Sequence, residues 1–264
     1  MQLIDSHCHL DAAEFDPDRD AVIARAQAAG VQAQVVPAVT AASWPKLRAV
    51  CAAAPGLYPA YGLHPLFLAE HRPDHLQALE DWIARERPCA IGECGLDFFV
   101  EGLDEAEQQR YFAGQLQLAR EFDLPVIVHA RRAVDAVILA IRKVGRLRGV
   151  VHSFAGSAEQ AAQLRSLDFL IGLGGPVTYE RAQRLRRLAA TMPLEQLLLE
   201  TDAPDQPDAA IRGQRNEPAR LRTVLDTIAE LRDAPAAAIA AQTTANARRL
   251  FGLPDTRAGT PVIA

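Results

Sequence analysis

Short apolar runs alternate with longer amphipathic segments along this chain, and the alternation repeats eight times. A short run that is apolar throughout predicts a strand buried on both faces, and the longer segments predict helices. Strands that alternate with helices indicate βα units and a parallel sheet. The expected strands are 2–5, 32–36, 57–61, 89–92, 125–128, 149–151, 169–172 and 197–199. The expected helices are 18–29, 42–53, 76–85, 105–122, 134–143, 158–165, 179–190, 218–232 and 236–251.

Eight such units in 264 residues favour an α/β fold closed into a (β/α)8 TIM barrel, because these barrels typically hold about 250 residues. An open doubly wound sheet is the alternative, and it often carries a glycine-rich phosphate loop. No G-x-x-x-x-G-K-[ST] motif is present, and no G-x-G-x-x-G follows the first expected strand. We therefore expect one barrel domain over residues 1–254 and a loose tail over residues 255–264.

The charge balance limits how the chain can meet other molecules. The net charge is −5, whereas a broad nucleic-acid-binding surface is usually basic, so any contact with phosphate must be local or made through bound metal. The four cysteines form no C-x-x-C pair, which favours free thiols in a reduced cytoplasmic setting. We expect neither a leader nor a membrane span, since no apolar run approaches about 20 residues. A monomer is the expected state.

Polar side chains follow several of the expected strands, at the end of a barrel that carries the active site. His7 and His9 follow the first strand and, with a period of two, point the same way, so they can grip one metal ion. Glu93 follows the fourth strand, where a buried carboxylate needs a cation or another partner. It can bridge two metals. The alternatives are a structural histidine pair and a salt-bridged glutamate.

Two more histidines and two acidic residues complete this pattern. His129 and His152 follow the fifth and sixth strands; each alone is as easily a core histidine, but together they indicate ligands. Glu200 and Asp202 follow the eighth strand and share a face, so spacing does not choose between them. Asp202 is nearer the mouth and is favoured as the ligand. Glu200 is then expected to orient a ligand or pair with a base.

This set of four imidazoles and two carboxylates predicts a centre of two divalent metal ions. Imidazole ligands suit Zn, Mn, Fe, Ni or Co more than Mg, which prefers oxygen. Two ions about 3.5–4 Å apart can lower the pKa of a bridging water to about 7 and polarise a phosphoryl or carbonyl oxygen. Asp202 is the candidate base that accepts the proton of that water, and Glu93 is the second candidate catalytic residue.

The motifs that carry these residues also resemble a known family. They are D-S-H-C-H-L at 5–10, G-L-H-P at 62–65, I-G-E-C-G-L-D at 91–97, the segment around His129, H-S-F at 152–154 and E-T-D-A-P at 200–204. In this order, from residue 4 to about residue 253, they are similar to the TatD family of metal-dependent hydrolases, within the amidohydrolase-like barrel superfamily.

The resemblance implies a division of the ligands between two metals. One metal would take His7, His9, Glu93 and Asp202, and the other would take Glu93, His129 and His152. Glu93 would then bridge, and Asp202 rather than Glu200 would be the ligand. Family members are described as Mg-dependent deoxyribonucleases, some of them exonucleases on single strands, and aminoacyl-ester cleavage has been linked to some relatives. Segment 174–179 differs from the aromatic–Lys pattern of the best-described nucleases, and the loss of that lysine, a candidate phosphate contact, weakens the nuclease assignment.

Residues further from the ligands are candidates for substrate binding. His64, after the third strand, can contact phosphate or orient a metal ligand. Arg131 can clamp phosphate, whereas Arg132 is better explained as the start of a solvated helix. Arg215 lies in the last βα loop, a usual phosphate-binding region of this fold. The aromatic residues Phe98, Phe99 and Tyr179 can stack on bases or pack at the rim.

The favoured function is a metal-dependent hydrolase acting on ester bonds, most specifically a phosphodiesterase or deoxyribonuclease that uses water activated by two metals. Single-stranded DNA or another phosphodiester would be the substrate. The alternative is an amide or ester hydrolase acting on a small molecule or an aminoacyl ester. A non-enzymatic metal-binding or nucleic-acid-binding protein is disfavoured by the complete ligand set. A wide groove would favour nucleic acid, and a deep closed pocket would favour a small molecule.

Overall fold

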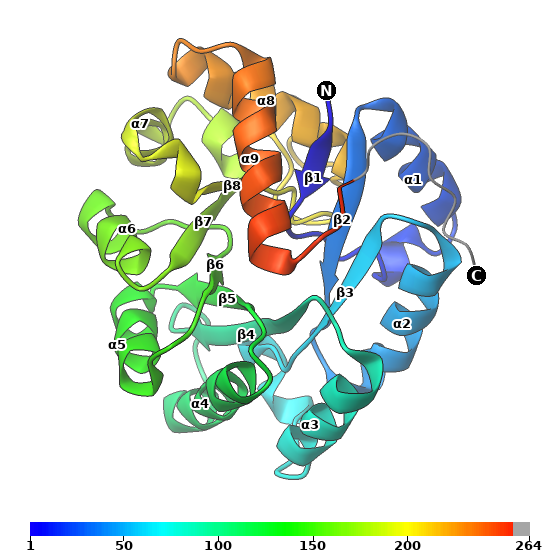
Figure 1. The fold of residues 1–264 in the computed structure, drawn as a ribbon, viewed down its shortest axis with the longest axis vertical. Helices are drawn as coiled ribbons and strands as arrows, with labels where there is room; N and C mark the ends of the chain where they lie inside the picture. Colours follow the sequence, from blue (N-terminus) through cyan, green and yellow to red (C-terminus); the bar gives the residue numbers. More distant parts are fainter. Residues whose placement is uncertain (256–264) are drawn as a thin grey trace.

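The computed structural model describes residues 1–255, in which eight parallel strands follow one another in chain order around a single sheet. The strands form the centre of the molecule and the helices surround them (Figure 1). The strands are β1 (Leu3–Asp5), β2 (Val31–Pro37), β3 (Leu57–Tyr61), β4 (Ala90–Asp97), β5 (Val126–Arg131), β6 (Gly149–Val151), β7 (Phe169–Leu173) and β8 (Leu197–Leu199). The helices are α1 (Arg19–Ala28), α2 (Trp44–Ala53), α3 (His75–Glu86), α4 (Glu105–Glu121), α5 (Val134–Val144), α6 (Ala158–Arg165), α7 (Gln183–Thr191), α8 (Leu221–Leu231) and α9 (Ala236–Phe251).

The expected (β/α)8 barrel is confirmed, and the differences are at element ends. Strand β4 continues through Asp97, past the expected end at residue 92, and β5 continues through Arg131. Helices α7 and α8 begin later than expected, because residues 179–182 form a turn before α7 and the 3-10 turn Pro218–Arg220 precedes α8. Of the expected tail, residues 256–264 lie outside the described residues.

Hydrogen bonds between the first and last strands bring the barrel near to closure. The Ser6 N–H donates to the carbonyl oxygen of Leu199 over 3.0 Å, and the Asp202 N–H donates to that of His7 over 2.9 Å. One carboxylate adds side-chain bonds across the same seam: Asp5 accepts from the N–H and the hydroxyl of Thr201. The segments that carry the expected ligands after β1 and β8 are therefore held side by side.

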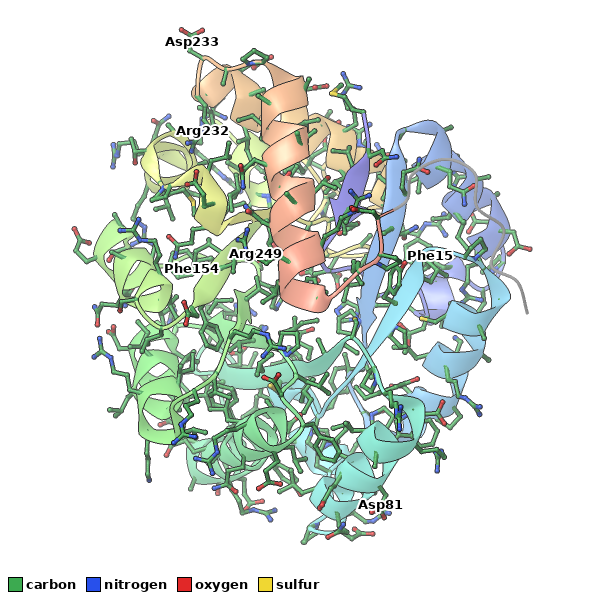
Figure 2. All side chains as sticks on the ribbon, in the orientation of Figure 1. Phe15, Asp81, Phe154, Arg232, Asp233 and Arg249 are labelled. Atoms are coloured by element: carbon green, nitrogen blue, oxygen red, sulfur yellow. The ribbon has the colours of Figure 1, made fainter. Side chains whose placement is uncertain are left out.

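Apolar side chains pack in two layers, inside the barrel and between the barrel and its helices. Figure 2 shows side chains filling the space between these elements. The interior layer joins small and branched strand residues to the last helix, α9, through Leu250 and Phe251. Helix α9 packs against β1 and β8 and lies across the strands in Figure 1. The carboxyl ends of the strands, where the polar residues lie, remain available for a site.

Within residues 1–255, no helix combines the length and the apolar character that a membrane-spanning segment requires.

Candidate metal centre

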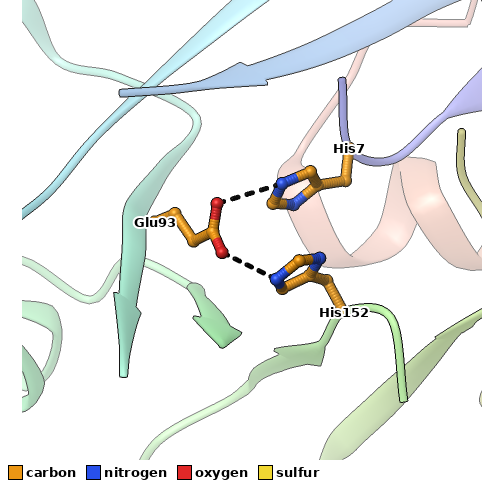
Figure 3. A group of neighbouring side chains, drawn as sticks. All are labelled: His7, Glu93 and His152. Carbon is orange, nitrogen blue, oxygen red and sulfur yellow. Dashed lines mark ion pairs between the residues drawn. The ribbon is translucent and has the colours of Figure 1, made fainter. Parts of the chain in front are cut away.

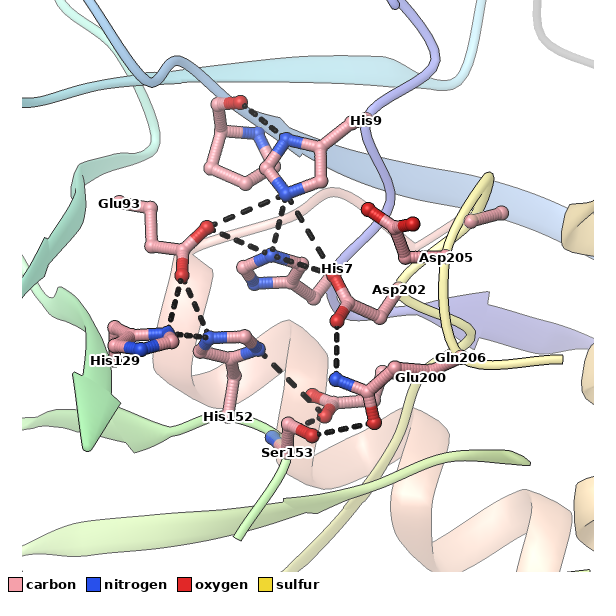
Figure 4. A network of polar contacts seen from close by, with 12 residues as sticks. His7, His9, Glu93, His129, His152, Ser153, Glu200, Asp202, Asp205 and Gln206 are labelled. Carbon is pink, nitrogen blue, oxygen red and sulfur yellow. Dashed lines mark hydrogen bonds and ion pairs between the residues drawn. The ribbon is translucent and has the colours of Figure 1, made fainter. Parts of the chain in front are cut away.

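All six predicted ligands converge at the carboxyl ends of the strands (Figure 4). His7 and His9 follow β1, Glu93 lies in β4, His129 in β5, His152 follows β6, and Asp202 follows β8. Two groups of these side chains have ligand atoms within 4.8 Å of one another, His7 with Glu93 and His152, and His7 with His9 and Asp202; a third group joins His64 to Glu93 and His129. The sequence prediction that these residues form one cluster is therefore consistent with the geometry.

The carboxylate of Glu93 lies between two pairs of histidines. Its Oε2 is 3.1 Å from Nε2 of His7 and 3.3 Å from Nε2 of His9. Its Oε1 is 2.7 Å from Nε2 of His152 and 3.2 Å from Nδ1 of His129. Figure 3 shows one oxygen directed at His7 and the other at His152, whose rings stack on the same side of the carboxylate. Each oxygen thus faces a different pair of the predicted ligand histidines, as a bridging ligand requires, and Oε1 also contacts His64.

Asp202 joins the first of these pairs, and Glu200 lies behind the second. Oδ1 of Asp202 is 3.4 Å from Nε2 of His7 and 3.6 Å from Nε2 of His9. Glu200 accepts the backbone N–H of Ser153, and its Oε1 is 4.0 Å from Nδ1 of His152. Asp202 faces the nitrogens of His7 and His9 that also face Glu93, whereas Glu200 faces only the far nitrogen of His152, so the geometry favours Asp202 as the ligand.

The backbone of β4 directs Glu93 into the mouth of the barrel. The register between β4 and β5 shifts between Ile91 and Cys94, an irregularity of the kind that re-aims side chains near active sites. Gly62 at the end of β3 permits this, because a Cβ there would lie 2.6 Å from the carbonyl carbon of Gly92. Only a residue without a side chain fits between β3 and the Glu93 segment.

Asp97 holds His129 in place, a role that sequence reasoning missed. Oδ2 of Asp97 is 2.9 Å from Nε2 of His129, and Oδ1 accepts the backbone N–H groups of Phe99 and Val100 over 2.9 and 3.1 Å. Burial opposes ionisation, but these hydrogen bonds lower the pKa of Asp97 to about 2. The ionised carboxylate accepts from Nε2 and leaves Nδ1 of His129 facing Glu93. Its only sequence signal was the face that Asp97 shares with Glu93.

His64 contacts Glu93, in agreement with one of the two roles predicted for His64, the orientation of a metal ligand. Its Nδ1 accepts the backbone N–H of Leu66 over 3.1 Å, so the neutral ring carries its proton on Nε2 and donates to Oε1 of Glu93 over 2.9 Å. Burial lowers the pKa of His64 to about 4, against the opposing charge of Glu93, so the ring is neutral at pH 7. His64 therefore orients the predicted bridging carboxylate, and it also lines the cavity described below.

The chemistry of this cluster fits divalent metal ions. Burial opposes protonation of His9 and His152, yet Glu93 raises their pKa values to about 9 and about 10. Imidazole nitrogens that compete for protons beside a buried carboxylate are sites where a cation can replace those protons. The mixed nitrogen and oxygen donors suit Zn or Mn, and they accept Mg less readily.

Five of the six ligands, all except His7, line a cavity of about 1310 Å³. Pockets for small molecules usually measure roughly 300–1,000 Å³. The lining also contains three aromatic side chains that are at least partly exposed, Phe67, Phe98 and Phe99, and three arginines, Arg131, Arg132 and Arg184. The cavity is larger than a small ester requires, and cations and aromatic rings are present in its wall.

Arg215 lies away from this cavity, contrary to the prediction that it contacts substrate. Its guanidinium donates to both carboxylate oxygens of Asp18 over 2.8 Å and to the carbonyl oxygen of Glu14. It also lies 4.8 Å from the centre of the Phe15 ring. Arg215 is not among the cavity-lining residues, because these contacts tie the last βα loop to the start of α1.

Comparison with known proteins agrees with this geometry. The family model described as "TatD related DNase" matches residues 4–252. The chain is 40% identical over 257 residues to YjjV, an uncharacterized metal-dependent hydrolase of Escherichia coli K12, covering 96% of this chain and 99% of that protein. It is 34% identical over 260 residues to the 3′-5′ ssDNA/RNA exonuclease TatD of Klebsiella pneumoniae strain 342, covering 95% and 98%.

A solved structure supports the same relationship. The crystal structure of the TatD homologue YjjV from Escherichia coli K12 superposes with a TM-score of 0.92 at 40% identity, over 96% of this chain and 98% of that one. Both the barrel and the family resemblance inferred from the motifs are therefore confirmed.

Proposed function

Because this chain belongs to the family of TatD-related DNases, which makes it a metal-dependent hydrolase, we propose that it cleaves phosphodiester bonds in single-stranded nucleic acid. The observation that carries the proposal is the carboxylate of Glu93, with one oxygen facing each histidine pair. We assign two divalent ions, Zn, Mn or Mg, to these ligands. His7, His9, Glu93 and Asp202 would hold one ion, and Glu93, His129 and His152 the other.

Asp202 is the proposed general base. When bound, divalent ions at these ligands would polarise a phosphoryl oxygen and lower the pKa of water to about 7. Burial raises the pKa of the Asp202 carboxyl above its ordinary value, which favours proton acceptance. The side-chain amide of Gln206 donates to Oδ2 of Asp202, and the hydroxyl of Ser153 donates to the oxygen of that amide. This chain of bonds orients Asp202 to take the proton of the attacking water.

Nucleic acid is the proposed substrate on the strength of the cavity. Its volume of about 1310 Å³ suits the end of a strand, and Arg131 in its wall can bind a backbone phosphate. The relative from Klebsiella pneumoniae is named as an exonuclease of single-stranded DNA and RNA, which supports the same substrate class here. Every proposed ligand comes from one chain, so we propose that the protein acts as a monomer.

Hydrolysis of an aminoacyl ester or small amide is the second candidate. Four carboxylates line the same cavity as the ligands, on Asp11, Glu14, Asp135 and Asp205. The α-amino group of an aminoacyl substrate would pair with such carboxylates, whereas they would repel the negatively charged phosphodiester backbone of a nucleic acid. The ligand cluster serves either reaction, since both need activated water and a polarised oxygen.

A direct comparison of substrates tests the proposal. Purified protein loaded with Mg, Mn or Zn is incubated with a 5′-labelled single-stranded oligonucleotide and, separately, with an aminoacyl ester. The Glu93→Ala variant serves as the blank. Metal-dependent shortening of the oligonucleotide by wild type alone supports the nuclease. Ester cleavage without shortening, in protein shown to contain metal, transfers the assignment to the second candidate.

A further inference from the structure

In the described part of the chain, two arginines at the mouth of the cavity have no acidic partner. Within residues 1–255, the guanidinium groups of Arg131 and Arg132 make no hydrogen bond and no ion pair. By contrast, Arg25 pairs with Glu217 and with Asp18. Both unpaired groups are exposed and line the cavity that holds the metal ligands. Their N–H donors are therefore available to an anionic substrate.

The guanidinium groups of Arg131 and Arg132 both lie against the ring of Phe99. The Cζ atom of Arg131 lies 3.7 Å from the centre of the Phe99 ring, and that of Arg132 lies 4.7 Å from it. A guanidinium that stacks on a ring keeps its donors in its own plane, free to bind phosphate at its edge. Phe99 is itself 43% exposed, so this stack stands at the solvent boundary of the cavity.

The backbone explains how two consecutive residues reach the same ring. Along a strand, neighbouring side chains point to opposite faces, so Arg131 and Arg132 would diverge if β5 continued. Arg132 instead adopts a φ of 53°, in the left-handed region that residues with a side chain rarely occupy. The change of direction after Arg131 brings both side chains to Phe99.

The same carboxylate fixes this stack and a metal ligand. Asp97 accepts the backbone N–H of Phe99 with Oδ1 and the ring N–H of His129 with Oδ2. Arg131 lies two residues beyond His129 on β5, and so shares its face of the strand. The position of the arginines relative to the ligands is therefore held from both β4 and β5.

We propose that Arg131 and Arg132, held in place by Phe99, form a clamp for a backbone phosphate next to the scissile one. This inference rests on the proposed function, and it names the part of the substrate that lies outside the metal centre. Arginine binds phosphate through paired N–H donors, and its fixed charge persists at every pH at which the protein is folded. Phe99 is a positioning residue in this clamp.

The salt dependence of binding tests the clamp. Metal-loaded protein is titrated with a fluorescein-labelled, single-stranded oligonucleotide whose phosphorothioate linkages resist hydrolysis, over a range of KCl concentrations. Each phosphate contact on a single strand contributes about −0.7 to the slope of log affinity against log salt. We expect the slope of Arg131→Gln/Arg132→Gln to be less negative than that of wild type by about 0.7 to 1.4.

A matched control and a second substrate separate binding from folding. Arg146→Gln/Arg187→Gln makes the same change of charge at exposed arginines outside the cavity and should keep the wild-type slope. The clamp variant should lose about tenfold or more in kcat/KM on an oligonucleotide, yet cleave bis(p-nitrophenyl) phosphate normally, since that diester has one phosphate. Phe99→Ala should weaken oligonucleotide binding, whereas Phe99→Tyr, which keeps an aromatic ring, should bind the oligonucleotide as wild type does.

The outcomes distinguish the clamp from the proposed function. If wild type cleaves the oligonucleotide and the clamp variant keeps the wild-type slope, the clamp is refuted and the nuclease stands. Equal losses on both substrates also refute the clamp, because they place the arginines in the support of the metal centre. If wild type binds with a steep slope that the clamp variant loses, but cleaves neither phosphodiester, the proposed function fails and the phosphate site remains.

Discussion

The hydrogen bond between Asp97 and His129 leads us to predict that replacing Asp97 lowers the affinity for metal. Asp97→Asn keeps the shape of the side chain but replaces one acceptor oxygen with an NH2 donor. With its oxygen toward the N–H groups of Phe99 and Val100, asparagine presents the NH2 to Nε2 of His129. Nε2 must then accept, and the proton moves to Nδ1, the nitrogen that faces Glu93. The opposite orientation of the asparagine amide is unfavourable, because its NH2 group would face the backbone N–H groups of Phe99 and Val100, which are also donors.

A protonated Nδ1 has no lone pair for a metal ion, so Asp97→Asn should weaken binding at the His129 side of the centre. Partners that orient a metal-binding histidine typically contribute 10–100-fold to affinity, which corresponds to about 1.4–2.7 kcal/mol. Competition with a chromophoric chelator measures the affinity, and circular dichroism checks the fold. Hydrolysis of the oligonucleotide should fall at limiting metal and recover in part when metal is raised.

The matched control is Asp135→Asn, which removes the same charge from an exposed carboxylate that lines the cavity and contacts Gln160. This control should keep the wild-type metal affinity. If both variants bind metal as wild type does, the assigned tautomer of His129 is wrong. Equal weakening in both would show that long-range charge, rather than the hydrogen bond, sets the affinity.

Three further predictions concern the surroundings of the ligands. A Cβ at Gly172 would lie 2.0 Å from Oε2 of Glu200, so Gly172→Ala should destabilise the fold by about 1–3 kcal/mol and lower activity. Added to Glu200→Ala it should cost little more, and additive losses in urea unfolding would contradict this. Gln206→Ala removes the donor to the proposed base, so kcat should fall several-fold with KM unchanged; an effect on KM alone would count against it. Hydrogen bonds from Arg215 lower the pKa of Asp18 to about 2, a stabilisation present above the ordinary value of 3.8 and lost as pH falls toward 2. Arg215→Ala should therefore flatten acid unfolding between these values and leave oligonucleotide cleavage unchanged, whereas slower cleavage would return Arg215 to the substrate site.

The barrel and the clustering of the proposed ligands were predictable because both follow from local pattern. Apolar runs alternate with helical segments, and each ligand stands directly after such a run, so His7 and Glu93 could be placed at one end of the barrel without coordinates. The start of α7 was wrong because propensity does not reveal that residues 179–182 form a turn before the helix begins at Gln183.

The supporting contacts were not predictable, because they join residues that are distant in the chain. Ser153 and Gln206 are 53 positions apart, and the loop conformations that bring them together are not visible in the residue pattern. For the same reason the role of Asp97 was missed, and Arg215 was assigned to substrate although it pairs with Asp18. Arg132 was interpreted as a solvated helix start, and it is exposed and lies two residues before α5, but its left-handed backbone could not be predicted from the strand pattern.

The metal content of wild type and of Glu93→Ala, measured together with oligonucleotide hydrolysis on the same samples, tests the central claim most directly. Both carboxylate oxygens of Glu93 face histidine pairs, so the account predicts two ions per wild-type chain. It predicts one ion or none in a folded Glu93→Ala variant, with hydrolysis at background. A folded variant that binds two ions, or that cleaves the oligonucleotide at the wild-type rate, would contradict the assignment of Glu93 as the bridge.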